Sequence, residues 1–154
     1  MSATSSVPAA LDAIASCFEG ILPATICSCD ADGTPNVTVI SQVYYVDETH
    51  AALSFQFFSK TIRNVRENPR AFVCLADLRG HASWVLQLEF QQSETEGPVF
   101  DTMDMQIEAI ASMTGMSGIF KLRAADIYRV LSVEKLPYPT WTGASSDDQA
   151  STGA

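Results

Sequence analysis

The chain has 154 residues, of which 47% are hydrophobic and 18% are charged, and its formal net charge is −9. This length fits one domain with one sizeable core, and the acidic balance argues against nucleic acid or an anionic membrane as the main partner. No apolar run approaches the roughly 18 to 20 residues of a membrane span, and the N-terminus lacks the pattern of a secretory signal. We therefore expect a cytoplasmic globular protein.

The sequence divides into three parts. Residues 1–7 are polar and are predicted to be flexible, and residues 137–154 form an acidic, low-complexity tail. Residues 8–136 between them are expected to form the folded domain.

Within this domain, hydrophobic periodicity and turn residues predict helices and strands. They are expected as follows: a helix from Pro8 to Gly20, strands at 24–29, 36–46 and 52–58, a helix from Ser59 to about Glu67, strands at 71–76 and 83–92, a helix from Pro98 to Gly115, and one or two strands within 118–135 with a bend at 124–126. Turns are predicted at 30–33 and 47–50. In the second strand, alternation places five side chains on one face: Val37, Val39, Ser41, Val43 and Tyr45.

Strands joined by tight turns, with helices only as inserts, favour an antiparallel barrel or sandwich over a βαβ sheet. The chain also lacks the glycine-rich fingerprints of Rossmann and P-loop proteins. The predicted fold class is mainly β with inserted helices (α+β).

Positive charge gathers in one stretch of this acidic chain. Residues 59–80 contain five basic and two acidic side chains. At the start of the predicted helix, Ser59, Lys60 and Thr61 would offer hydroxyls, a cation and unpaired backbone N–H groups to a phosphate, with Asn64 one turn further on. An ordinary capped surface helix would have the same pattern.

Polar side chains interrupt two of the predicted strands. Ser41 and Gln42 lie in the second strand, and Ser54 and Gln56 in the third. Buried polar groups need hydrogen-bond partners, which a flat heterocycle or water could provide.

Catalysis by side chains alone finds little support in the sequence. The four cysteines lack metal-ligand spacing and are expected to be reduced thiols, so we predict no metal site. His81 lies in a predicted loop with no carboxylate or cysteine pattern nearby, and no nucleophile motif is present. If the protein is an enzyme, a cofactor is expected to carry the chemistry.

Three stretches resemble the pyridoxamine 5'-phosphate oxidase-like family of FMN-binding split barrels: DGTPNVTVISQVYYVD, LSFQFFSKTIRNVRENPRA and TGMSGIFKLRAADIYRVLSVEKL. The resemblance covers residues 10–136 and implies an antiparallel FMN-binding split barrel. It implies a phosphate site at Ser59, Lys60 and Thr61. It places the flavin ring and ribityl chain against a further set of positions: Ile40, Ser41, Gln42, Ser54, Phe55 and Gln56. It also implies a homodimer with FMN in a groove shared by two subunits.

Two departures from the family pattern keep alternatives open. Val39 and Tyr44 stand where the founding oxidases have basic phosphate ligands, which leaves deazaflavin, haem through His81, or an empty groove as alternatives to FMN. The segment KLPYPTWTG has no counterpart of the residues that bind the phosphorylated substrate, so pyridoxamine phosphate oxidation is not predicted. The resemblance implies an FMN-binding oxidoreductase acting on an unknown small substrate, with no catalytic residue assigned. The alternatives are a non-catalytic flavin or haem sensor and a structural dimer.

Overall fold

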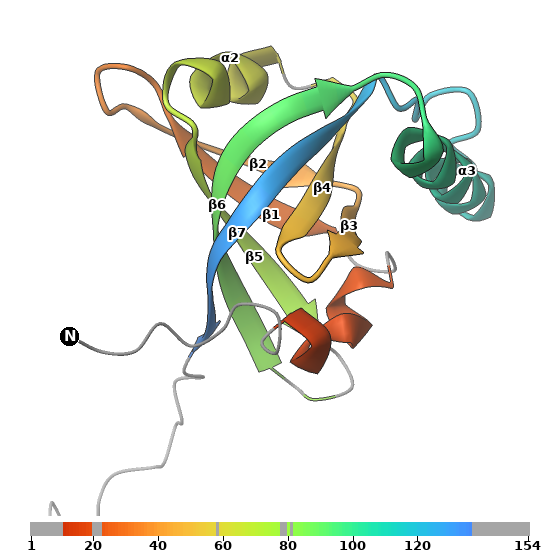
Figure 1. Cartoon of the computed structure of the whole chain (residues 1–154). Coiled ribbons are helices and arrows are strands. Elements are labelled where there is room, and N and C mark those ends of the chain that lie inside the picture. Colours follow the sequence, from red (N-terminus) through yellow and green to blue (C-terminus); the bar gives the residue numbers. More distant parts are fainter. Residues whose placement is uncertain (1–10, 20–22, 58, 78–79, 81, 137–154) are drawn as a thin grey trace, which may run out of the picture.

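The computed structural model describes residues 11–19, 23–57, 59–77, 80 and 82–136. Its elements in chain order are η1 (Ala15–Phe18), β1 (Ala24–Cys29), β2 (Pro35–Ile40), β3 (Val43–Asp47), β4 (His50–Phe55), α2 (Ser59–Glu67), β5 (Arg70–Asp77), β6 (Ala82–Glu94), α3 (Pro98–Met113) and β7 (Ala124–Leu136). The seven strands form one antiparallel sheet in the order β2-β1-β5-β6-β7-β4-β3 (Figure 1). The predicted α+β class is confirmed.

The sheet closes because its two edge strands are consecutive in the chain. β2 and β3 lie at opposite ends of the strand order, yet only Ser41 and Gln42 separate them. Two residues cannot span a flat sheet of seven strands about 4.8 Å apart, so the sheet must curl. The backbone N–H of Ser54 in β4 donates to the carbonyl of Gln42 at 3.2 Å, which ties the connection to the far edge.

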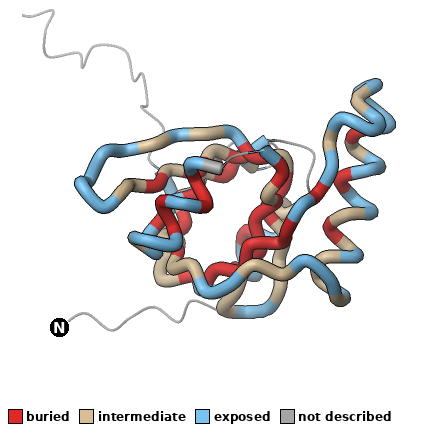
Figure 2. The backbone as a smooth tube through the Cα atoms, turned by 90° about the horizontal axis from the view of Figure 1, so that it is seen from above, coloured by how far each residue is buried: buried red, intermediate tan, exposed pale blue. Residues whose placement is uncertain are grey.

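The core fills the inside of this curled sheet. Seen along the barrel, the buried residues line the inside of the ring of strands (Figure 2). Ile62 and Val65 of α2 join this core at one end of the barrel, and Leu11 and Ile14 join it from the chain that leads into η1. The i, i+3 spacing of Ile62 and Val65 is what gives α2 its inward face.

α3 stands beside the ring of strands and packs on its outer surface (Figures 1 and 2). Gly97, with φ of +101°, precedes Pro98 at the first turn, as the sequence predicted. Met103 and Ile107 are buried in a second apolar cluster that includes residues of β4 and β7. None of the helices in the described residues has the length and apolarity that a bilayer span requires.

The structure corrects two sequence predictions. The run 36–46 is not one strand, because the chain leaves β2 at Ile40 and enters β3 at Val43. Its predicted common face is therefore wrong: Val37 and Val39 are 64% and 55% exposed, whereas Val43 is buried. The bend at 124–126 is also wrong, because these residues form the start of β7 and pair with β4.

Other predictions agree with the structure or fall outside it. β1 matches the predicted strand 24–29, and α2 matches the helix from Ser59 to Glu67. At the turn after β1, the Asp30 carboxylate accepts hydrogen bonds from two backbone N–H groups, and Gly33 has φ of +81°. The predictions for residues 1–7 and 137–154, like those for Pro8, Gly20 and His81, lie outside the described residues.

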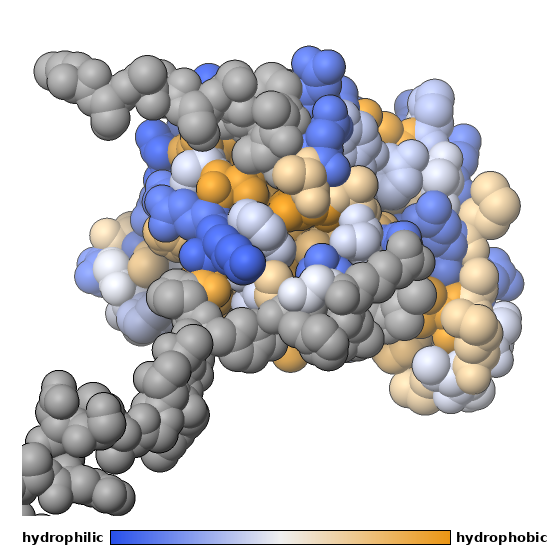
Figure 3. All heavy atoms as spheres, turned by 90° about the horizontal axis from the view of Figure 1, so that it is seen from below, coloured by the Kyte–Doolittle hydropathy of each residue, from blue (hydrophilic) through white to orange (hydrophobic). Residues whose placement is uncertain are grey.

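Apolar side chains are unevenly distributed on the surface. On the face seen from below, they gather in the middle, with hydrophilic residues beside them (Figure 3). Elsewhere, Val37 of β2 and Phe72 of β5 both lie beside Cys27 of β1 in the sheet register, and Val37 and Phe72 are 64% and 44% exposed. Neighbouring antiparallel strands present paired residues on the same face, so these three side chains form an outer row that is exposed at Val37 and Phe72 and half-buried at Cys27.

Candidate cofactor site

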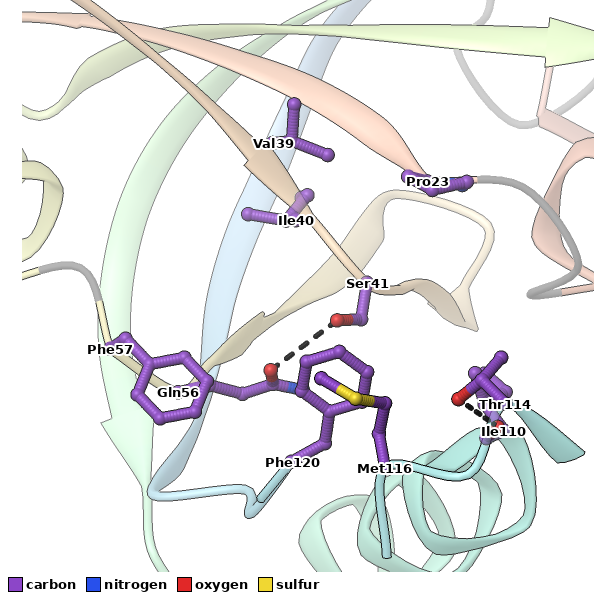
Figure 4. A pocket seen from close by; sticks show the side chains of 10 residues that line it. All are labelled: Pro23, Val39, Ile40, Ser41, Gln56, Phe57, Ile110, Thr114, Met116 and Phe120. Carbon is purple, nitrogen blue, oxygen red and sulfur yellow. Dashed lines mark hydrogen bonds between the residues drawn. The ribbon is translucent and has the colours of Figure 1, made fainter. Parts of the chain in front are cut away.

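A pocket of about 500 Å³ opens where β2 and β4 end and α3 approaches the barrel (Figure 4). Its size falls within the usual range for small-molecule sites. Ten described residues line it: Pro23, Val39, Ile40, Ser41, Gln56, Phe57, Ile110, Thr114, Met116 and Phe120. None of these ten has an ionisable side chain.

Two polar side chains meet in this pocket. The Ser41 hydroxyl donates to Oε1 of Gln56 at 3.3 Å, and the two side chains point toward each other (Figure 4). Gln56 is only 3% exposed, and its Nε2 is buried with no hydrogen-bond partner among the described residues. An unpaired buried donor costs about 1–3 kcal/mol, so this amide is suited to a ligand that brings an acceptor.

Gln42 lies behind the residues that line the pocket and supports them through hydrogen bonds. Its backbone N–H donates to Oγ of Ser54 at 3.2 Å, and its side-chain Nε2 donates to Gln106 of α3. Gln42 is 1% exposed and does not line the pocket. Gln42 therefore links the connection between β2 and β3 to α3, and α3 contributes the opposite wall of the pocket.

α2 begins a few residues after Gln56 and presents two different faces. Lys60 is exposed, as are Arg63 and Arg66. Thr61 and Asn64 face the barrel instead: Oγ1 of Thr61 accepts a hydrogen bond from Asn36 at 3.2 Å, and Nδ2 of Asn64 donates to Ser28 at 3.1 Å. The side chain of Ser59 lies outside the described part of the structure.

A buried carboxyl lies near α2, inside the barrel. Asp126 of β7 is 5% exposed and accepts a hydrogen bond from the Ser93 hydroxyl at 2.5 Å. Burial raises the pKa of this carboxyl from 3.8 to about 6, although the Ser93 hydrogen bond and the charge of Arg66 act to lower it. Asp126 was predicted to be part of a bend, yet a single acidic residue within the mainly apolar stretch AADIYRV was a signal of a buried ionisable group.

The structure brings together only some of the residues expected to bind a cofactor. Ile40, Ser41 and Gln56 line the pocket. Gln42 and Ser54 support it through hydrogen bonds, and the half-buried Phe55 packs against the main core. The wall that α3 and the segment after it contribute was not predicted from the sequence; it consists of Ile110, Thr114, Met116 and Phe120.

All four cysteines lie in the described part of the chain, are half-buried and carry free thiols. Burial, together with the neighbouring Cys74 and Cys29, raises the pKa of Cys27, which disfavours its thiolate at neutral pH. Among the described residues, no group of three or more His, Cys, Asp or Glu side chains is arranged to hold a metal ion.

The sequence profile described as pyridoxamine 5'-phosphate oxidase matches residues 10–130. The chain belongs to this family. The resemblance seen in the sequence is thereby confirmed. No curated protein matches the chain significantly.

Solved structures agree with this family in their fold. An FMN-binding protein from Syntrophomonas wolfei has a TM-score of 0.66 and 13% identity, over 88% of this chain and 86% of its own. A structure named F420 reductase has a TM-score of 0.57 and 13% identity, over 77% and 94% of the two chains. HutZ, the haem storage protein from Vibrio cholerae, has a TM-score of 0.54 and 13% identity, over 80% and 92%. At these identities the likeness shows the fold, which is that of the FMN-binding split barrels.

Proposed function

We propose that the protein binds FMN and acts as an FMN-dependent oxidoreductase on a small substrate. The observation that carries this proposal is that two features suited to FMN lie close together in one segment. The side-chain amide of Gln56, which has no hydrogen-bond partner among the described residues, precedes the first residue of α2 by three positions. A planar ring with carbonyl acceptors would satisfy the amide, and a phosphate would lie at the helix start.

The described residues fit this cofactor in part. Lys60 is exposed at the first turn of α2, where the backbone N–H groups have no partners within the helix. Thr61 and Asn64 are engaged with Asn36 and Ser28, so we assign the phosphate to the backbone N–H groups and Lys60, with Ser59 as the resemblance implies. When bound, FMN would supply the electron-transfer chemistry, and the chain would position its ring and limit its access to water.

The cofactor assignment is tested by titrating FMN into the purified protein and following flavin absorbance and fluorescence. We expect saturable binding, which Lys60→Ala weakens at least tenfold because a charge-assisted hydrogen bond is lost. Lys135→Ala is the matched control, since Lys135 is an exposed lysine beside Trp84, near the start of β6. Absence of FMN binding, or equal effects of the two variants, would overturn the assignment. Deazaflavin and haem, the alternatives raised by the sequence, have visible spectra distinct from that of FMN.

We also propose that two copies associate through the outer row of Val37, Cys27 and Phe72. Val39, on the same strand as Val37, is 55% exposed and lines the pocket, so the row continues into the candidate site. Burial of such a row stabilises an interface by roughly 25 cal/mol per Å² of apolar surface. Light scattering should give the mass of a dimer, and Val37→Lys should shift it toward the monomer. A wild-type protein that is monomeric at micromolar concentration would contradict this association.

A further inference from the structure

α3 has apolar side chains on two opposite sides, and the barrel covers one of them. Met103 and Ile107 face the barrel and are buried. On the other side, Met105 and Met113 are 68% and 81% exposed, and Ala109 between them is also exposed. Residues four positions apart lie one above the other on a helix, so Met105, Ala109 and Met113 form one strip along α3, the α3 stripe.

The α3 stripe differs from single apolar residues scattered over a surface. α3 stands beside the ring of strands, so its outer side points away from the barrel (Figures 1 and 2). A continuous apolar strip with polar residues beside it is typical of an interaction site, whereas isolated apolar side chains are ordinary on any surface. Methionine is unbranched and adaptable, which suits it to contact with another protein.

Carboxylates line one edge of the α3 stripe. At about 100° per residue, Asp101 and Glu108 lie within about 60° of Met105 around the helix axis, and both are exposed. The half-buried Asp104 lies between them in the sequence. None of these three carboxylates forms an ion pair with another described residue. Like charges three and four positions apart destabilise a helix, so this edge does not serve α3 itself and suits a cationic partner.

The charge around α3 also narrows the choice of partner. Residues 94–120 contain five acidic side chains and no lysine, arginine or histidine. An anionic membrane would be repelled, and two copies paired through α3 would bring carboxylates against carboxylates. α2 of a second copy has cations but no apolar side chain for the α3 stripe, because its exposed side chains among the described residues are Lys60, Arg63, Arg66 and Glu67.

We propose that the outer side of α3 binds a basic amphipathic helix of a partner protein. The apolar side chains of that helix pack on the α3 stripe, and its lysines or arginines pair with Asp101 and Glu108. One helix makes a small interface, so we expect a dissociation constant roughly in the micromolar range. The proposal does not depend on FMN, because the residues that carry it do not line the pocket.

Two synthetic peptides test this chemistry on the full chain by fluorescence anisotropy. Fluorescein-labelled LKKLLKLLKKLLKL is a basic amphipathic helix, and LEELLELLEELLEL keeps its apolar positions with the opposite charge. We expect the lysine peptide to bind at least about tenfold more tightly than the glutamate peptide. Equal binding of the two peptides, or no binding of the lysine peptide, would overturn the proposal.

Charge variants distinguish α3 from the acidic molecule as a whole. Asp101→Asn combined with Glu108→Gln should weaken binding of the lysine peptide about fivefold or more. The matched control combines Asp32→Asn with Glu48→Gln, which removes the same charge from two exposed positions outside α3 and should change binding by less than about twofold. Equal weakening by the two pairs would show that binding follows net charge alone, which contradicts a site on α3.

Methionine variants test the α3 stripe itself. Met105→Gln combined with Met113→Gln keeps the side-chain length and a good helix former at each position, and should weaken the lysine peptide about fivefold through lost apolar contact. Leu136→Gln is the control, because it removes a 39% exposed apolar side chain from the end of β7. Unchanged binding by the methionine variant would contradict the proposal.

Light scattering of the methionine variant shows whether a second copy covers the α3 stripe. A change from dimer to monomer would assign the stripe to a second copy and overturn the partner assignment. An unchanged mass, together with weaker peptide binding, would support a separate partner. It would also separate this surface from the association proposed through the outer row of Val37, Cys27 and Phe72.

Discussion

Two buried polar clusters in this molecule have opposite hydrogen-bond states. Beneath α2, Asn64 is paired with Ser28, and Thr61 with Asn36. At the pocket, Gln56 is buried to the same degree as Asn64, yet its Nε2 has no partner among the described residues. A paired cluster contributes to stability, whereas an unpaired buried donor costs stability unless a ligand completes it. The cluster beneath α2 therefore serves the fold, and the pocket cluster is the better candidate for binding.

The largest expected effect concerns Asp126, a buried side chain that has a hydrogen-bond partner but can ionise. Folding raises the pKa of this carboxyl from 3.8 to about 6, so its protonated form is favoured in the folded state. The stability that it contributes is fully present below about pH 4 and is lost as the pH rises through about 6, by up to about 3 kcal/mol. Urea unfolding from pH 4 to 7 measures this loss.

Asp126→Asn isolates this contribution, because the amide keeps an acceptor for Ser93 and cannot ionise. The difference in unfolding free energy between the wild-type protein and this variant should depend on pH, with the wild type losing stability relative to the variant between pH 4 and 7. Parallel pH profiles for the two proteins would contradict the raised pKa.

The next effect concerns the paired cluster. Asn64→Leu should lower the free energy of unfolding by about 1–3 kcal/mol, because the buried hydroxyl of Ser28 loses its partner. Adding Ser28→Ala should restore part of the loss, since both polar groups are then gone. Denaturant unfolding of the single and double variants measures this, and a single variant as stable as the wild type would show that the hydrogen bond contributes nothing.

The smallest effect is expected from the same kind of substitution at the unpaired cluster. Gln56→Leu removes a buried donor without a partner, and the half-buried Ser41 can turn to water. Its free energy of unfolding should fall by no more than about 1 kcal/mol below that of the wild type, because the substitution also removes the cost of the unpaired donor. A loss as large as that of Asn64→Leu, measured in the same way, would mean that the two clusters do not differ.

Local sequence patterns were sufficient for most of the fold. The strand at 24–29, the turn at 30–33 and the helix starting at Ser59 each have residues whose conformational preferences agree with the structure. The family followed from three longer stretches. The break between β2 and β3 at Ser41 and Gln42 could not be predicted from local sequence, because the alternating side-chain pattern continues through these two residues. The chain leaves one strand for the next there only because the sheet closes into a barrel.

The candidate site was predictable on one side only. Ser41 and Gln56 were identified as polar residues in apolar strands, whereas Met116 and Phe120 reach the pocket through the packing of α3, which no local pattern reports. The inward position of Thr61 and Asn64 could have been found: with Ile62 and Val65 they occupy one helical face, at spacings of one, three and four residues.

The two-residue connection between β2 and β3 also has a thermodynamic consequence. Ser41 belongs to this connection and Gln56 follows β4, so these two polar side chains of the pocket meet only when the sheet has closed. A ligand held by both would bind the closed barrel and not the open chain. By mass action, such a ligand at 100 times its dissociation constant would raise the unfolding free energy by about 2.7 kcal/mol. Thermal shift in the presence of candidate compounds is therefore a direct screen for the natural ligand of this protein.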